Sequence, residues 1–206
     1  MSSKKQVIVI HGGDFFDSRA EFVASLQKEK ITKEDLLGKS AKRWKDNLLE
    51  DLGSEYEVLA PEMPNPHDAK YAEWKIWFEK VIPFMEKEVI LVGHSLGGIF
   101  LARYLSENRF PSKIKGLFLV AAPYFTPGKN GMNANAGFTV PKTLKKIEAS
   151  AESIVLYHSE DDPIVKVSHV KRYAKALSKA RQIVFKDRGH FRQERFPEVI
   201  EAIRNL

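Results

Sequence analysis

Six short apolar segments divide the chain, and helical patterns lie between them. Most of these segments are continuously apolar rather than alternating, which is typical of strands covered on both faces. They are VIVI from Val7, EVLA from Glu57, VILV from Val89, LFLV from Leu117, IVLY from Ile154 and IVF from Ile183. From the second segment onward the starts recur about every 30 residues, the size of a βαβ unit. The pattern predicts an α/β fold with a mostly parallel sheet and helices on both faces.

The segments between the predicted strands carry apolar residues at helical spacing. Residues 18–29 and 41–53 fill the long first gap, and Gly53 is placed to end the second of these helices. Residues 69–84 form a third pattern, whose apolar side chains are predicted to be core: Tyr71, Trp74, Ile76, Trp77, Phe78, Val81 and Ile82. Residues 126–137 are rich in Gly, Asn and Pro, which indicates a long loop.

Length and composition indicate one folded domain without covalent staples. The 206 residues suit a single domain over 1–206, and no low-complexity stretch divides them. The absence of cysteine excludes disulfides and thiolate metal sites. The first apolar run is four residues long, too short for a signal peptide, and no run approaches the ~18 residues of a membrane span. We therefore expect a cytoplasmic protein that does not contact a membrane.

The net charge of +6 raises the question of an acidic partner. Basic residues concentrate in 166–181, which indicates either a nucleic-acid surface or the solvated face of an amphipathic helix. Val170, Tyr173 and Leu177 would form the buried stripe of that helix. No nucleic-acid motif accompanies the charge, so the solvated face is favoured and no nucleic-acid partner is expected.

Ser95 lies in the sequence GHSLGG, three residues after the apolar run that ends at Val92. A G-x-S-x-G pattern between a strand and a helix is typical of a nucleophile elbow, which projects the serine oxygen above the sheet. Gly93 and Gly97 remove Cβ atoms that would clash in so sharp a turn. The following helix, predicted over 96–106, favours negative charge at its start. An ordinary Gly/Ser turn is the alternative.

A serine nucleophile needs a histidine base and a carboxylate that orients it, in the chain order Ser, Asp or Glu, His. Glu160, Asp161 and Asp162 follow the fifth apolar run, and His190 follows the sixth. Carboxyl ends of neighbouring parallel strands meet at one edge, so these groups are expected to meet there. Pro163 biases the residue before it toward an extended conformation, which favours Asp162 among the three acids. An exposed acidic turn and a surface histidine are the alternatives.

The loop after the first strand, HGGD at 11–14, is the expected source of a second oxyanion-hole donor. Gly13 is the candidate, together with the backbone N–H of Leu96. His11 and His94 are interpreted as hydrogen-bonded supports around the site. Five aromatic residues are candidates to line an apolar acyl pocket, although each equally suits ordinary packing: Phe15, Phe16, Tyr124, Phe125 and Phe138.

With these motifs, the chain resembles the retinoblastoma-binding protein 9-like serine hydrolases, a compact branch of the α/β-hydrolase superfamily. The matching stretches are PEMPNP at 61–66, GHSLGG, GFTVPK at 137–142, SEDDPIV and DRGHF. The resemblance implies Ser95, Asp162 and His190 as a catalytic triad, a six-stranded sheet of order 2-1-3-4-5-6 and no large lid. The segment 29–52 is longer than in the shorter relatives, and it is a candidate to border the pocket.

The sequence therefore predicts a serine hydrolase that cleaves small carboxylic ester or amide bonds through an acyl-enzyme intermediate. A binding module on the same fold, with little or no turnover, is the alternative. A lyase or a cofactor-free peroxidase would also share the fold. No HExxH, P-loop or G-x-G-x-x-G pattern occurs, so no metal and no organic cofactor are expected. The expected partner is a small-molecule ester or amide, and no protein partner is indicated.

Overall fold

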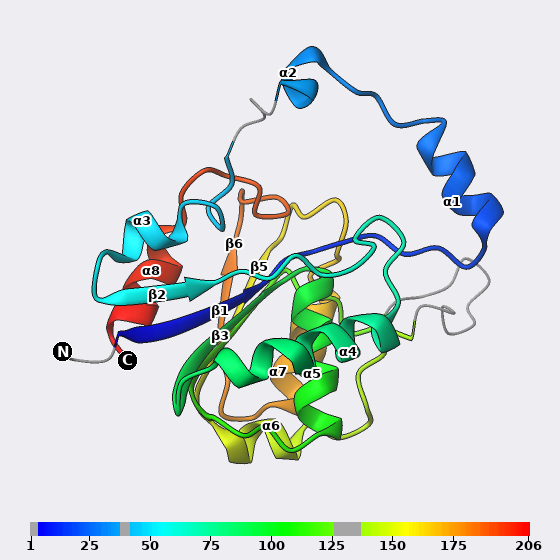
Figure 1. Ribbon diagram of the computed structural model, residues 1–206. Coiled ribbons are helices and arrows are strands. Elements are labelled where there is room, and N and C mark those ends of the chain that lie inside the picture. The colour runs from blue at the N-terminus through cyan, green and yellow to red at the C-terminus, as the bar shows by residue number, and fades with distance from the viewer. Residues whose placement is uncertain (1–3, 38–41, 126–136) are drawn as a thin grey trace.

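A parallel sheet of six strands forms the centre of the protein (Figure 1). The computed structural model describes residues 4–37, 42–125 and 137–206. The strand order is β2-β1-β3-β4-β5-β6, and every adjacent pair is parallel, which confirms the predicted fold. The strands are β1 (Lys5–Ile10), β2 (Tyr56–Leu59), β3 (Glu88–His94), β4 (Lys113–Val120), β5 (Ala151–Ser159) and β6 (Arg181–Phe185).

Helices cover both faces of this sheet. Figure 1 shows α4 to α7 on one face, and α3 and α8 on the other. The helical elements within the described ranges are α1 (Arg19–Leu26), α2 (Lys33–Leu36), α3 (Leu48–Leu52), α4 (Tyr71–Val81), the 3₁₀ helix η1 (Ile82–Phe84), α5 (Leu96–Glu107), α6 (Lys145–Ser150), α7 (Ser168–Ala176) and α8 (Pro197–Arg204).

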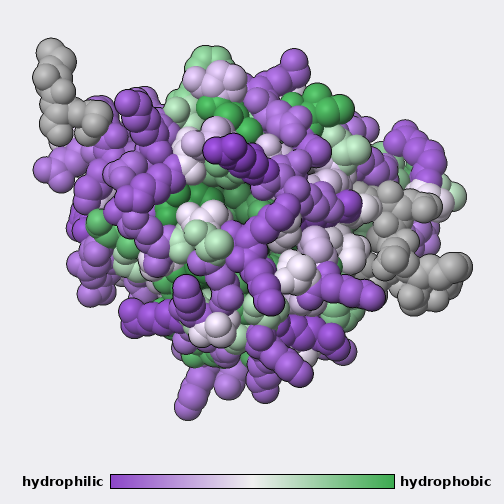
Figure 2. All heavy atoms as spheres, turned by 90° about the horizontal axis from the view of Figure 1, so that it is seen from below, coloured by the Kyte–Doolittle hydropathy of each residue, from purple (hydrophilic) through white to green (hydrophobic). Residues whose placement is uncertain are grey.

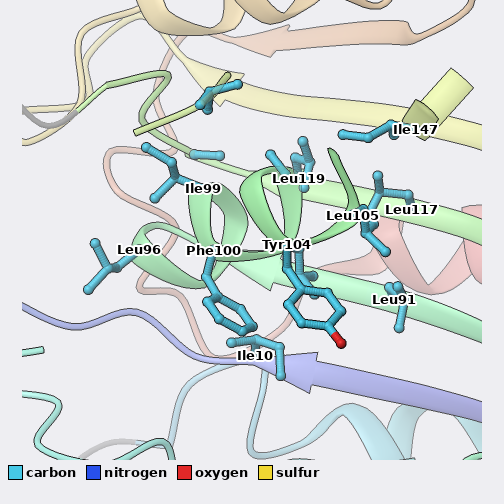
Figure 3. Close-up of a cluster of buried hydrophobic side chains, with 14 of the residues drawn as sticks. Ile10, Leu91, Leu96, Ile99, Phe100, Tyr104, Leu105, Leu117, Leu119 and Ile147 are labelled. Atoms are coloured by element: carbon cyan, nitrogen blue, oxygen red, sulfur yellow. The ribbon is translucent and has the colours of Figure 1, made fainter. Parts of the chain in front are cut away.

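Two hydrophobic cores lie on the two sides of the sheet, because successive side chains of a strand point to opposite faces. Ile8 and Ile10 of β1 join the core with α4 to α7, whereas Val7 and Val9 join the core with α3 and α8. Figure 3 shows the first core, in which Phe100 and other side chains of α5 gather with residues of the central strands. This packing holds α5, and therefore the turn before it, rigidly over the sheet.

The helices differ in part from their sequence patterns. In α4 only Tyr71, Trp74 and Phe78 are buried, whereas Ile76 is 60% exposed and Trp77 is 44% exposed. A helix on a sheet buries one stripe, so the wider core assignment for this segment is wrong. The basic helix α7 buries Val170 and Tyr173, and Leu177 directly after it is also buried, as the pattern predicts.

The segment between β1 and α3 departs from the body of the molecule. Figure 1 shows α1 and α2 extending away from the sheet, and neither helix has a buried residue. The predicted second helix is shorter than its pattern: α3 begins at Leu48 and ends before Gly53, whose φ is 92°. Residues 38–41 lie outside the described part of the chain.

Hydrophilic residues cover most of the face shown in Figure 2, with groups of hydrophobic residues between them. Across the described ranges, no helix combines the length and the apolar character needed to cross a bilayer. The single domain, the cytoplasmic location and the absence of a large lid stay predictions. The predicted loop at 126–137 lies outside the described residues except for Gly137.

Candidate active site

Ser95 occupies a strained turn between β3 and α5. Its φ of 53° and ψ of −120° lie outside the regions that L-residues prefer. Its N–H donates to the carbonyl of Val120 on the neighbouring strand, at 2.8 Å. A Cβ on Gly97 would lie 2.2 Å from the carbonyl oxygen of Ile10, so only glycine lets α5 approach β1 so closely. The turn therefore has the geometry of a nucleophile elbow.

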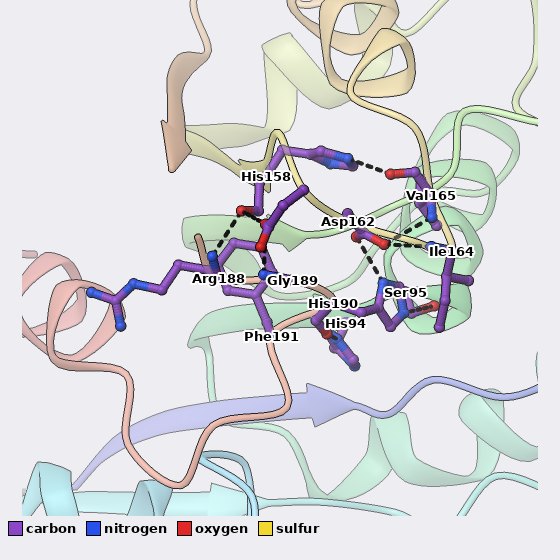
Figure 4. A network of polar contacts seen from close by, with 12 residues as sticks. His94, Ser95, His158, Asp162, Ile164, Val165, Arg188, Gly189, His190 and Phe191 are labelled. Atoms are coloured by element: carbon purple, nitrogen blue, oxygen red, sulfur yellow. Dashed lines mark hydrogen bonds and ion pairs between the residues drawn. The ribbon is translucent and has the colours of Figure 1, made fainter. Parts of the chain in front are cut away.

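Ser95, His190 and Asp162 form one chain of hydrogen bonds (Figure 4). The Ser95 hydroxyl lies 2.9 Å from Nε2 of His190, and Nδ1 of His190 lies 2.8 Å from Oδ2 of Asp162. In the neutral imidazole, Nδ1–H donates to the carboxylate and Nε2 accepts from the hydroxyl. His190 and Asp162 are each 8% exposed. The structure thus brings together the three side chains that the sequence selects, and their catalytic roles stay predictions.

The carboxylate of Asp162 is held in place by three donors. Its Oδ1 accepts from the backbone N–H groups of Ile164 and Val165, at 2.8 and 2.9 Å. Burial alone would raise the pKa of Asp162, but the hydrogen bonds from His190 and from these two N–H groups outweigh burial and lower the pKa below its usual value. Asp162 is therefore an ionised acceptor for His190 at neutral pH.

Asp161 has a different role in the same turn. Its Oδ1 accepts from the hydroxyl of Ser159 at 2.5 Å and from the backbone N–H of Gly189 at 2.8 Å. In the turn that follows β5, Asp161 therefore reaches the loop before His190 rather than the imidazole.

Two buried side chains hold the backbone of the loop that carries His190. Nε2 of His94 donates to the carbonyl of His190 at 2.9 Å, and Nε1 of Trp44 donates to the carbonyl of Phe191 at 3.0 Å. Burial, followed by the charge of Lys45, lowers the pKa of His94 well below its usual value, so His94 is neutral. His94 is confirmed as a hydrogen-bonded support. Trp44 was missed, because nothing in the local sequence links it to a loop 147 residues away.

The loop after β1 places two glycines beside the elbow. A Cβ on Gly12 would lie 3.2 Å from Cβ of Ser95, and one on Gly13 would lie 2.6 Å from the carbonyl oxygen of Pro66. His11 supports this loop: its Nδ1–H donates to the carbonyl of Gly12 at 2.5 Å, and its Nε2 accepts from the N–H of Met63 at 2.8 Å.

Leu96 is the first residue of α5, so its N–H has no acceptor within the helix. It follows Ser95 directly and is therefore a suitable oxyanion donor by position. The assignment of Gly13 and Leu96 as the two donors stays a prediction.

A cavity of about 410 Å³ lies beside Ser95. The 29–52 segment borders it, as the sequence suggests. The lining residues are Gly12, Gly13, Asp14, Glu29, Arg43, Lys45, Pro66, His67, His94, Ser95, Ile164, His190 and Arg192. This lining is mostly polar and charged, whereas an apolar acyl pocket was expected.

None of the five predicted aromatic residues is among the lining residues of this cavity. Phe138 is fully buried in the core against Trp74, with ring centroids 5.3 Å apart, so its assignment to the pocket wall needs correction. Phe15 is partly buried against the same core, and Phe16 packs on the ring of Phe22. A loop aromatic gives no sequence signal that separates core from pocket wall.

The other two aromatic residues pack against α7. Tyr124 contacts the ring of Tyr173, and Phe125 lies over the ring of His169 with centroids 4.6 Å apart. Their contact with substrate stays a prediction, as it does for Phe15 and Phe16. The described residues contain no group of three or more His, Asp or Glu side chains placed to hold a metal ion.

Known proteins with similar sequences and folds identify the family of this chain. The serine hydrolase family model matches residues 35–203. Serine hydrolase RBBP9 from Rattus norvegicus is 31% identical over 157 residues, which cover 73% of this chain and 78% of the rat protein.

Two solved structures illustrate the fold. The ydeN gene product of B. subtilis has a TM-score of 0.69 at 22% identity and covers 98% of both chains. Naproxen esterase (carboxylesterase NP) from Bacillus subtilis has a TM-score of 0.60 at 15% identity, covering 100% of this chain and 84% of the esterase. These likenesses show an α/β-hydrolase fold, and the sequence matches go further: the chain belongs to the serine hydrolase family.

Proposed function

We propose that this hydrolase cleaves small carboxylic esters through an acyl-enzyme formed on Ser95. The observation that carries the proposal is the hydrogen-bonded chain from Ser95 through His190 to Asp162, with distances of 2.9 and 2.8 Å. A serine hydroxyl needs such a base to become a nucleophile, and the base needs a fixed tautomer. Amides are the second class of substrate that the same groups can cleave.

The reaction follows from the positions of the protons. Ser95 attacks the substrate carbonyl while Nε2 of His190 takes the hydroxyl proton. Asp162 stabilises the resulting imidazolium, which then gives its proton to the leaving group. The backbone N–H groups of Leu96 and Gly13 hold the negative oxygen of the tetrahedral intermediate. Water releases the acid by the same route.

Two features favour turnover over a role as a binding module. A positive φ at a non-glycine residue costs about 1–3 kcal/mol, which surrounding structure must compensate. The elbow at Ser95 carries this cost, and the adjacent imidazole is aligned by a buried carboxylate. A module that binds without catalysis would need neither feature.

A fluorophosphonate probe tests the nucleophile. We expect one label per chain, on Ser95, because among the residues that the structure describes only this hydroxyl has a base aligned by a carboxylate. Ser95→Ala should abolish labelling and hydrolysis of p-nitrophenyl acetate, as measured by mass spectrometry and absorbance, while circular dichroism stays unchanged. Ser54→Ala, at an exposed serine, is the control and should keep both activities.

Two outcomes would count against the proposal. Labelling that persists in Ser95→Ala would place the nucleophile elsewhere. Labelling of the wild type without turnover of esters or anilides would favour the binding module, or a lyase or peroxidase on this fold.

A further inference from the structure

The cavity beside Ser95 is unusual in its charge. Ligand pockets are lined mainly by apolar side chains with a few polar groups. Here three cationic side chains, Arg43, Lys45 and Arg192, share the lining with Ser95 and His190. The lining also holds two carboxylates, of Asp14 and Glu29, which are exposed, as are Arg43 and Arg192. Lys45 is the one charged side chain of Lys, Arg, Asp or Glu in this lining that is partly buried.

Lys45 is the informative member of this group. It is half-buried, and no carboxylate within the described ranges lies within 4.0 Å of its ammonium. The carboxylate of the next residue, Asp46, accepts from the backbone N–H of Arg43 at 2.8 Å. Burial, and then the charge of Arg43, lower the pKa of Lys45 to about 8. Removing a charge from water without pairing it is unfavourable, and Lys45 is half-buried without a carboxylate partner in the described part of the chain.

The position of this unpaired charge connects it with the reaction. Lys45 and Arg43 also line an adjoining cavity of about 700 Å³ with His11 and Gly12, and Arg192 lines one of about 570 Å³ with His190. Cationic side chains from two separate segments therefore share cavities with the site: Arg43 and Lys45 come from the segment before α3, and Arg192 comes from the loop that carries His190.

We propose that the substrate carries an anionic group, a carboxylate or a phosphate, which Lys45 binds together with Arg43 and Arg192 while the ester lies against Ser95. This inference rests on the proposed function and names its substrate class. No bond of the anionic group changes during the reaction. Lys45 donates hydrogen bonds to it, and the exposed arginines at the rim attract it from solution.

Matched pairs of esters test the inference. The first pair is the mono-p-nitrophenyl ester of adipic acid and its methyl ester, and the second is p-nitrophenyl 5-phosphonopentanoate and its dimethyl ester, whose longer chains disfavour attack of the anion on its own ester. Hydrogen bonds between charged groups predict a kcat/KM about 10- to 100-fold higher for the anionic member, mainly through a lower KM. The pair that shows the larger ratio identifies the group as a carboxylate or a phosphate.

Variants of Lys45 test whether this residue causes the higher kcat/KM of the anionic ester. Lys45→Met keeps the length of the side chain without its charge, and the anionic-to-neutral ratio should fall toward one. Lys45→Arg should retain most of the ratio. Lys171→Met removes the same charge from an exposed position on α7 and should leave the ratio unchanged.

Binding without turnover gives an independent measurement. Calorimetric titration of the wild type with monomethyl succinate and with inorganic phosphate should show binding of at least one, and Lys45→Met should lose it. Equal kcat/KM for both members of each pair overturns the inference and leaves the proposed function standing. Failure to hydrolyse any ester overturns the proposed function, and the inference then fails if the wild type binds neither anion.

Discussion

Asp161 and Asp162 are adjacent carboxylates with separate tasks, and this separation determines what each substitution does. Oδ1 of Asp162 faces the backbone N–H groups of Ile164 and Val165, while Oδ2 faces His190. In Asp162→Asn, the single amide oxygen should face the two N–H donors, which turns the NH₂ group toward the imidazole. Nδ1 must then accept, the proton moves to Nε2, and His190 no longer serves as the base.

We expect Asp162→Asn to lower kcat by about 10⁴, the loss found for the equivalent change in a serine protease. Asp161→Asn is the matched control, because its amide oxygen can still accept from Ser159 and Gly189, and it should lose less than about tenfold. Initial rates with a p-nitrophenyl ester, together with circular dichroism, measure both. A larger loss for Asp161→Asn would exchange the two assignments.

The sequence selected Asp162 from the adjacent Pro163 and from family resemblance. It gave no sign of the donors on Ile164 and Val165, since a backbone N–H has no residue type. Phe138 shows that the position of a side chain can also be hidden from the sequence. Aromatic side chains suit a core and a pocket wall equally, and only the fold shows that Phe138 packs against Trp74 in the core.

At the scale of elements, the loop after β6 presents His190 without belonging to the sheet. His94 at the end of β3 and Trp44 before α3 hold two successive carbonyls of this loop. In His94→Phe, the ring remains but the donor is lost, and the carbonyl of His190 is left unpaired, at a cost of about 1–3 kcal/mol. The imidazole should then lose its alignment with Ser95.

We therefore expect His94→Phe to lower kcat by about tenfold or more with little change in KM, because binding groups stay in place. His94→Gln retains an amide donor and should recover part of kcat. Steady-state kinetics and the rate of fluorophosphonate labelling of Ser95 measure the effect. Equal losses of kcat in both variants, accompanied by equal losses of stability in urea unfolding, would indicate a purely structural role.

The elements themselves were predictable where the sheet buries them. The central strands β1, β3, β4 and β5 carry continuous apolar runs, and the sequence places them correctly. The edge strands are less clear: only three apolar residues mark β6, and its side chains are exposed or half-buried. The cationic cavity was not predictable, since Arg43 and Arg192 come from distant segments that only folding brings together.

At the scale of the whole molecule, the parallel topology gathers the site at one edge of the sheet. The same topology places the ammonium of Lys45 near the ends of β1 and β3. Its neighbours are Arg43, which repels it, Asp46, which attracts it, and His11 and His94, whose pKa values it helps to lower. Lys45 binds an anion in the proposed complex, but without that anion its desolvated charge lowers the stability of the folded protein.

The pH dependence of stability tests whether the charge of Lys45 destabilises the fold. The pKa of Lys45 is about 8 in the folded protein and 10.5 in the reference state. Below pH 8 the lysine is charged in both the folded and the unfolded state, and desolvation of its charge lowers the free energy of unfolding by the full amount. The cost fades as the pH rises from about 8 to above 10.5, where the lysine is neutral in both states. Lys45→Met should therefore raise the free energy of unfolding by about 1–3 kcal/mol at pH 7, after allowance for partial exposure.

The gain from Lys45→Met should shrink toward zero near pH 10.5, as measured by urea unfolding at several pH values. Lys171→Met, at an exposed position, should show no such trend. A gain of equal size at pH 7 and pH 10.5 would mean that Met packs better, not that a charge was removed. An anion that pairs with Lys45 also raises its pKa, so monomethyl succinate or phosphate should stabilise the wild type at pH 7 and leave Lys45→Met unchanged.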